Sequence, residues 1–197
     1  MADDEWKDLF NGVDLAGWAV TGNADGWIVK DGMIVCLAEQ GGYLYTEDQY
    51  EDFELELQYR HDPDANSGIF FRWSDLSDPV HTGLEIQILD THGHEPMQRH
   101  SCGALYDLVA PEVDMARPAG EWNEANLVCK GSFVQYALNG RQIVSVDIDQ
   151  WSEAGRNPDD TENKFKYAWR DMSRLGHIGL QDHGGQVWFR DIRLRSL

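Results

Sequence analysis

The sequence predicts an all-β protein, an antiparallel β-sandwich, from three observations. Turn-forming residues recur about every eight to twelve residues, with short runs of alternating apolar and polar residues between them. In residues 53–60 this alternation is strict, so one face is apolar and the other carries charged and amide groups. Asn139-Gly140 lies between two further alternating runs, and both positions of such a hairpin turn accept a positive φ. We expect residues 1–197 to form a single domain, since sandwiches of this length are commonly one unit.

The first half of the chain contains six predicted strands. The first two are apolar runs separated by the turn Asp31-Gly32. In the sixth, Ile86 and Ile88 point to one face while Glu85 and Gln87 point to the other. The six strands are 27–30, 33–37, 42–45, 53–60, 68–73 and 83–90.

The second half contains five more predicted strands. Gly131-Ser132 joins the first two, and Asn139-Gly140 leads into the third. The turn His183-Gly184-Gly185 separates the last two. The five strands are 126–130, 133–138, 141–148, 176–182 and 186–195.

One short helix is expected near 159–171. Asp160 and Thr161 offer caps there, and Phe165 and Trp169 stand at the i, i+4 spacing of a helix face. The connections 91–102 and 111–122 have no strand character, and long connections in compact domains are often functional.

The charge of the chain limits its partners. Acidic residues number 35 and basic residues 16, which gives a net charge of −19. Such a field repels nucleic acid and anionic membranes, and it argues against a strongly anionic substrate. A small neutral carbohydrate or polyol fits better, and the oligomeric state stays open.

Cysteine use and the start of the chain bear on its compartment. Cys36, Cys102 and Cys129 are far apart and lack the spacing of metal sites, so we expect buried free thiols. The start resembles no signal peptide, and no run approaches the roughly 18 apolar residues of a membrane span. The sequence as given predicts a soluble cytoplasmic protein, or a periplasmic or secreted one if it is a trimmed mature form.

Two strands place polar groups on the face opposite their aliphatic residues. Glu85 and Gln87 share one face of 83–90, and the same parity groups His177, Gln181 and His183. Polar groups that converge on a cleft are the default hypothesis for an active site, although a solvated outer face would show the same pattern.

Further candidates come from the strand 68–73 and its surroundings. Parity places Arg72 on the face of Phe70, where it could bind a sugar hydroxyl or polarise a carbonyl, although a surface ion pair is equally consistent. Trp73 and Tyr106 could stack on a sugar, although aromatic residues in a sandwich are more often core. Additional candidates to bind substrate are Asn66 and Asp90.

Histidines follow the strand that carries Glu85. His92, His94 and His100 lie in the loop after Asp90, and a His-x-His spacing can place two imidazoles on one metal ion. A divalent ion is therefore a candidate cofactor, with solvated loop histidines as the alternative.

These residues together resemble a known family. The chain is similar to the 3-keto-disaccharide hydrolase domain, a family with a concanavalin-A-like jelly-roll sandwich. The resemblance runs nearly end to end, although Asp191 stands where the family usually has asparagine. The motifs that support it are Leu9-Phe10-Asn11-Gly12, Leu15-Ala16-Gly17-Trp18, Trp27-Ile28-Val29-Lys30-Asp31-Gly32, Asn66-Ser67-Gly68-Ile69-Phe70-Phe71-Arg72, Gly83-Leu84-Glu85-Ile86-Gln87-Ile88-Leu89-Asp90, Gly176-His177-Ile178-Gly179-Leu180-Gln181-Asp182-His183-Gly184 and Val187-Trp188-Phe189-Arg190-Asp191-Ile192.

The resemblance implies action on glycosides whose sugar carries a ketone at C3. Such a reaction removes the C2 proton, eliminates the aglycone and hydrates the enone, which requires a base, an acid and donors to the enolate. Glu85 and His183 are the expected base and acid, in either order. Arg72, Gln87 and Gln181 are the expected donors.

Two other functions fit the same fold. Retaining glucanases carry two carboxylates about 5–5.5 Å apart. Here the comparable stretch reads Glu85-x-Gln87-x-x-Asp90, with an amide in the central position and Asp90 in the wrong parity unless a bulge intervenes. The third function is a carbohydrate-binding module without catalysis, because a fold does not determine an activity.

Overall fold

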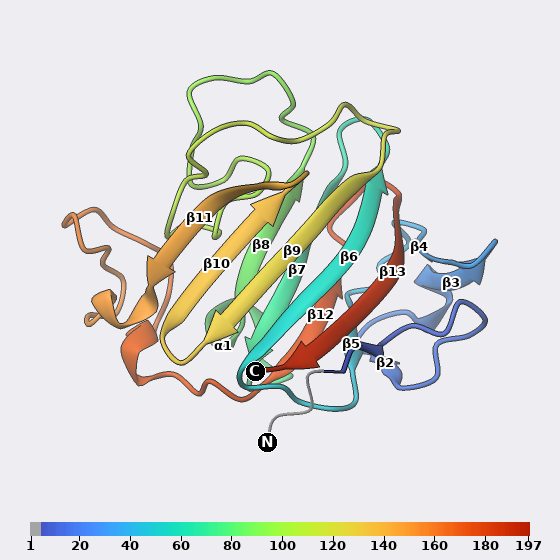
Figure 1. Ribbon diagram of the computed structural model, residues 1–197, viewed down its shortest axis with the longest axis horizontal. Coiled ribbons are helices and arrows are strands. Elements are labelled where there is room, and N and C mark those ends of the chain that lie inside the picture. Colours follow the sequence, from blue (N-terminus) through green and yellow to red (C-terminus); the bar gives the residue numbers. More distant parts are fainter. Residues whose placement is uncertain (1–4) are drawn as a thin grey trace.

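The computed structural model describes residues 5–197 and consists of two antiparallel β-sheets packed face to face (Figure 1). The larger sheet has eight strands, in the order β11 (Arg141–Asp147), β10 (Phe133–Leu138), β9 (Asn123–Lys130), β6 (Phe53–His61), β13 (Val187–Ser196), β4 (Met33–Cys36) and β3 (Trp27–Lys30), with β1 (Lys7–Asp8) paired to β13. The smaller sheet has five, in the order β2 (Trp18–Val20), β5 (Tyr43–Thr46), β12 (His177–Gln181), β7 (Asn66–Trp73) and β8 (Leu84–Leu89). The predicted all-β antiparallel sandwich is confirmed.

The core lies between the two sheets. Burial in β6 alternates at every residue, as the sequence pattern predicts, and Ile86 and Ile88 of β8 are completely buried. Burying an aliphatic side chain of this size contributes roughly 1.5–3 kcal/mol, which fixes the face that each strand turns inward. Glu85 and Gln87 must then point out of the smaller sheet, away from its partner.

A β-bulge in β7 alters the predicted parity of that strand. Gly179 pairs with Phe70 and His177 with Trp73, so two residues of β7 lie opposite one of β12. The extra residue, Arg72, has a φ of 51°. The bulge brings Trp73 onto the face of Phe70, with ring centroids 6.2 Å apart, and turns Arg72 away from it. The prediction that Phe70 and Arg72 share a face is therefore wrong.

The helix expected near 159–171 is reduced to one 3-10 turn, η3 (Trp169–Asp171). Asp159 accepts hydrogen bonds from both the backbone N–H and the hydroxyl of Thr161, and such local bonds compete with helix formation. Phe165 and Trp169 still meet, edge to face at 5.0 Å. Elsewhere in the described chain there are two 3-10 turns and a single α-helical turn, namely η1 (Ala24–Gly26), η2 (Ile148–Gln150) and α1 (Pro79–Thr82). Within residues 5–197, no helix is both long and apolar enough to cross a bilayer.

The three cysteines are buried free thiols, as expected.

Candidate active site

A pocket of about 480 Å³ opens on the face of the smaller sheet that points away from the larger one. Its floor comes from strands β5, β7, β8 and β12. Its walls come from α1, from the loop after β8 and from the loop between η2 and η3. The lining residues are Tyr43, Asn66, Phe70, Val80, Glu85, Gln87, Leu89, His100, Tyr106, Lys164, Gln181, Asp182 and His183.

Glu85 is the buried carboxyl group of this pocket. Its residue pairs with Phe70 of β7, and its side chain lies across Gly68, where a Cβ atom would collide with Oε1 of Glu85. Burial raises the pKa of Glu85 to about 7, and the charge of Lys164 opposes this rise. No described residue donates a hydrogen bond to the carboxylate, so both of its oxygens are available to a ligand.

The backbone around Glu85 is fixed on both sides. β7 pairs with one edge of β8, and the loop that follows covers the other edge. The N–H of Tyr106 donates to the carbonyl of Glu85 (2.9 Å), and the N–H of Gln87 donates to the carbonyl of Ala104 (3.0 Å). The carboxyl group is thus carried by a strand that is hydrogen-bonded along both edges.

Lys164 brings a cation into the pocket from the loop between η2 and η3. Its Nζ lies 4.0 Å from the centroid of the Tyr106 ring, and its backbone N–H donates to the carboxylate of Asp107 (2.7 Å). Burial lowers the pKa of Lys164, while the charges of Glu85 and Asp107 raise it. Sequence reasoning missed this residue because a single lysine in an irregular loop shows no periodicity or motif.

Amide and hydroxyl groups surround the carboxyl. Gln87 donates to the side-chain oxygen of Asn66 (3.1 Å), which holds both amides at the pocket floor. Gln181 donates to the hydroxyl of Tyr43 (3.3 Å), while its own Oε1 is buried without a partner among the described residues. Burial raises the pKa of Tyr43. Tyr43 was also missed, since its short strand carries no other polar site residue.

Two histidines lie at the rim. His183 is exposed, on the glycine-rich turn that follows β12, and it lines the same pocket as Glu85. His100 contacts Asp107 (3.0 Å) and packs on Tyr106, with ring centroids 4.8 Å apart. Glu85, Gln87 and Gln181 thus line one pocket, as the parity of their strands predicts, and His183 lines it from the turn after β12.

Three predicted site residues lie elsewhere. Arg72 is buried and donates to the backbone carbonyl of Glu51 (3.1 and 3.0 Å), because the bulge turns it away from the pocket. Trp73 is completely buried beside Tyr43 and offers no surface to a sugar. Asp90 accepts a hydrogen bond from the backbone N–H of Asp64 (3.1 Å) outside the pocket lining.

The three loop histidines do not form a metal centre. His92 contacts the carbonyl of Ala116 (2.7 Å), His100 contacts Asp107, and the exposed side chain of His94 shares no partner with them. Within residues 5–197, no group of three or more His, Cys, Asp or Glu side chains is arranged to hold a metal ion. The hypothesis of a metal on His92, His94 and His100 is not supported by their geometry.

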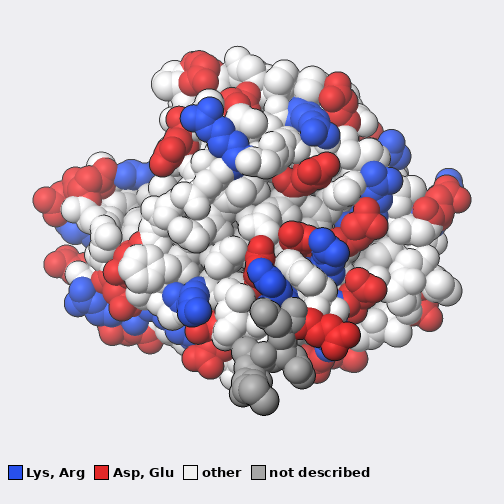
Figure 2. All heavy atoms as spheres, viewed as in Figure 1, with Lys and Arg blue, Asp and Glu red and all other residues white. Residues whose placement is uncertain are grey.

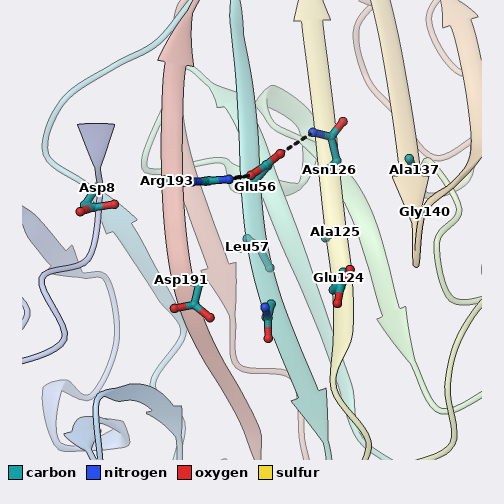
Figure 3. Close-up of a pocket in the computed structure, with 11 residues that line it drawn as sticks. Asp8, Glu56, Leu57, Glu124, Ala125, Asn126, Ala137, Gly140, Asp191 and Arg193 are labelled. Carbon is teal, nitrogen blue, oxygen red and sulfur yellow. Dashed lines mark hydrogen bonds and ion pairs between the residues drawn. The ribbon is translucent and has the colours of Figure 1, made fainter. Parts of the chain in front are cut away.

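A second hollow, of about 730 Å³, lies on the outer face of the larger sheet. There Lys and Arg alternate with Asp and Glu over β6 and β13 (Figure 2). Glu56 accepts from Nε of Arg193 (2.8 Å) and Asn126 bonds to the same carboxylate (Figure 3). Since Glu56 is already paired, this hollow lacks the free buried carboxyl that acid–base chemistry needs, and the pocket of Glu85 is the better candidate.

Comparison with known proteins identifies the family to which the chain is similar. A family model described as a 3-keto-alpha-glucoside-1,2-lyase-like domain matches residues 5–195. A 3-keto-disaccharide hydrolase from Bacteroides thetaiotaomicron is 26% identical to the chain, over 98% of this chain and 79% of that protein.

Solved structures show the same architecture. A candidate glycosyl hydrolase from Parabacteroides distasonis superposes with a TM-score of 0.89 at 31% identity, covering 98% of this chain and all of that one. A Bacillus subtilis protein with a galectin-like fold superposes with a TM-score of 0.59 at 13% identity, covering 100% and 96%. The second likeness concerns the fold alone, and it confirms the lectin-like sandwich that the sequence predicts.

Proposed function

Because the chain belongs to the 3-keto-alpha-glucoside-1,2-lyase-like domain family, we propose that it cleaves glycosides whose sugar carries a ketone at C3. The Bacteroides relative is named as a hydrolase of 3-keto-disaccharides, which fits a small neutral substrate of this class. The observation that best supports the proposal is Glu85, a buried carboxyl with a pKa of about 7 and free oxygens in a polar pocket.

The chemistry requires one well-placed base. A ketone at C3 acidifies the proton on C2, and the glycosidic oxygen on C1 is then β to the carbonyl. Removing the C2 proton gives an enolate, the enolate expels the protonated aglycone, and water adds across the resulting enone. The general acid–base step contributes typically 10²–10⁴-fold to such a rate.

Glu85 is the proposed base. A carboxyl with a pKa near 7 is partly ionised at neutral pH and is far more basic than an exposed glutamate. Its carboxylate lies on the pocket floor, and the adjacent amides of Gln87 and Gln181 are suited to hold the hydroxyls of a sugar ring. A ring bound on these amides would present a C–H bond to Glu85.

His183 is the proposed acid. It lies at the open rim, where the aglycone of a bound glycoside would extend towards solvent. An imidazole can both donate and accept a proton, so it can protonate the departing oxygen and later activate the incoming water. The partly exposed ring of Tyr106 lines the same pocket and is available to pack against the sugar.

The pocket favours this chemistry over direct glucanase action. Asp90, the second carboxylate of a glucanase-like strand, lies outside the pocket lining and bonds to Asp64. Asp182 does line the pocket, but its Oδ2 accepts from the backbone N–H of Gly41 (2.7 Å). A retaining mechanism needs two free carboxylates on either side of one bond.

The deciding assay compares a 3-keto-glucoside with its unoxidised parent in deuterated water. We expect aglycone release from the keto-sugar alone, with deuterium at C2 of the product. Glu85→Gln and His183→Ala should each lose about 10²-fold or more in kcat. Glu124→Gln is the matched control, because Glu124 is an exposed carboxylate on the larger sheet.

Two results would contradict the proposal. Cleavage of the unoxidised glucoside at a similar rate would indicate a glucanase. Binding of both sugars without turnover of either would indicate a carbohydrate-binding module.

A further inference from the structure

The pocket contains one fixed positive charge whose function the acid–base scheme leaves unassigned. Of the thirteen residues that line the pocket, Lys164 alone is a lysine or arginine. The residue is exposed to solvent on one side, and its Nζ donates to no hydrogen-bond acceptor among residues 5–197. The cation is therefore held in the pocket without a protein oxygen to neutralise it directly.

Several contacts fix the position of this lysine. Its Nζ lies 4.0 Å from the centroid of the Tyr106 ring, and its backbone N–H donates to the carboxylate of Asp107. The same loop is also held just before Lys164 by Arg99, which donates to Asp159 (2.6 Å) and Thr161 (2.7 Å). A lysine carried by a loop with this many anchors is placed with little freedom in its backbone.

We propose that Lys164 is a catalytic residue that binds the C3 ketone oxygen of the substrate and stabilises the enolate. This inference rests on the proposed function, since it assigns the electrophile of the same reaction. Removal of the C2 proton transfers negative charge to the C3 oxygen, and the positive charge of an ammonium stabilises it better than the neutral amides nearby. The interaction between Nζ of Lys164 and the C3 oxygen is electrostatic, and no covalent bond to the nitrogen forms.

The placement also explains how the pocket selects an oxidised sugar. A ketone oxygen is only an acceptor, whereas a hydroxyl also carries a proton that an ammonium cannot accept. A ketone in front of Lys164 thus satisfies one of its donors without leaving a group unpaired. The parent alcohol would have to rotate its proton towards solvent or towards Glu85.

The test uses Lys164→Met, which keeps much of the stem and removes the charge. The matched control is Lys166→Met, because Lys166 is an exposed lysine two residues further on whose Nζ lies 3.5 Å from Asp78. We expect Lys164→Met to lose about 10²–10³-fold in kcat/KM on a 3-keto-glucoside, the usual scale for one oxyanion donor. Lys166→Met should stay within about threefold of the wild type.

A pH profile distinguishes this role from a structural one. The charge of Lys164 lowers the pKa of Glu85, so its removal should move the acidic limb of kcat/KM to higher pH. Circular dichroism and thermal unfolding of each variant establish that the fold is retained. A lost rate with an unmoved acidic limb would contradict the proposal.

Binding provides a readout that does not depend on turnover. We expect the wild type to bind a 3-keto-glucoside more tightly than its parent glucoside, and Lys164→Met to lose that preference while its affinity for the parent is kept. If the wild type neither releases aglycone nor exchanges C2 hydrogen, the proposed function fails, and this preference still decides the contact with Lys164. The inference would be overturned if Lys164→Met preferred the 3-keto-glucoside over the parent glucoside as strongly as the wild type does. A sugar adduct trapped on Lys164 by borohydride would also overturn it, because such an adduct would indicate an imine.

Discussion

Glu85 occupies a position that disfavours its own charge. It is about nine-tenths buried, its carboxylate receives no hydrogen bond from a described residue, and the partial compensation comes from Lys164. A folded-state pKa above the unfolded one means that the folded protein holds an extra proton between about pH 4.5 and pH 7. The contribution of Glu85 to the free energy of unfolding therefore falls as pH rises through this range, which is the usual cost of an active-site carboxyl.

This cost can be measured. Between pH 4.5 and pH 7 the ionisation of Glu85 should remove on the order of 3 kcal/mol from the free energy of unfolding. Glu85→Gln cannot ionise, so relative to wild type it should gain stability as pH rises from 4.5 to 8. Denaturant unfolding of both proteins across this range measures the difference, which cancels the other titrating groups. If the free energies of unfolding of the two proteins changed in parallel with pH, the pKa of Glu85 would not be raised by its burial.

Parity in the sequence was sufficient to place the polar residues on regular strands. Glu85, Gln87 and Gln181 reach one pocket because each lies on an unbroken strand whose apolar neighbours are buried. Lys164 could not be placed in this way, since its position depends on a loop held by Asp107. Tyr43 was missed because its role appears only when β5 pairs with β12.

At the scale of strands, the pairing of β7 with β8 determines where the carboxyl of Glu85 lies. Gly68 of β7 has no side chain, and the carboxyl group of Glu85 occupies the space where a Cβ atom at Gly68 would lie. The pairing also explains the misplaced residues of β7. A single extra residue at Arg72 reverses the parity of everything after it, and no local signal in a run of apolar and aromatic residues marks such a bulge.

Gly68→Ala tests whether the carboxyl group of Glu85 must occupy the space above Gly68. The new methyl group would collide with the side chain of Glu85, and that side chain is flexible enough to move away. We expect kcat on a 3-keto-glucoside to fall by about 10-fold or more, because a displacement of about 1 Å in a reacting group is costly. The midpoint of thermal unfolding should change little by comparison. A variant with full activity would show that Glu85 need not lie where the structure places it.

For the whole molecule, the dominant electrostatic property is its net charge of −19. The two-sheet architecture was predictable because it depends only on short alternating runs and glycine turns spread along the chain. The predicted helix failed because its i, i+4 pair, Phe165 and Trp169, is also brought together by a loop that hydrogen-bonds within itself. Net charge, unlike these features, is a property of composition and acts on any fold the chain adopts.

Self-repulsion at this net charge predicts a response to salt. Raising NaCl from about 10 mM to about 0.3 M shortens the range of charge interactions from roughly 30 Å to less than 10 Å. The midpoint of thermal unfolding should therefore rise by a few degrees. Sucrose at matched osmolality is the control for effects other than screening. A fall with salt would mean that ion pairs such as Arg193 with Glu56 outweigh the general repulsion.

The covered outer edge of β8 affects whether copies of the chain can associate by strand addition. An edge strand normally presents a row of unpaired N–H and C=O groups, which is a template for strand addition and aggregation. Here Gly103, Ala104 and Tyr106 occupy those groups along the central part of the strand. A second copy of the chain cannot extend the sheet at this point. The strand that carries Glu85 is thus protected from edge-to-edge aggregation.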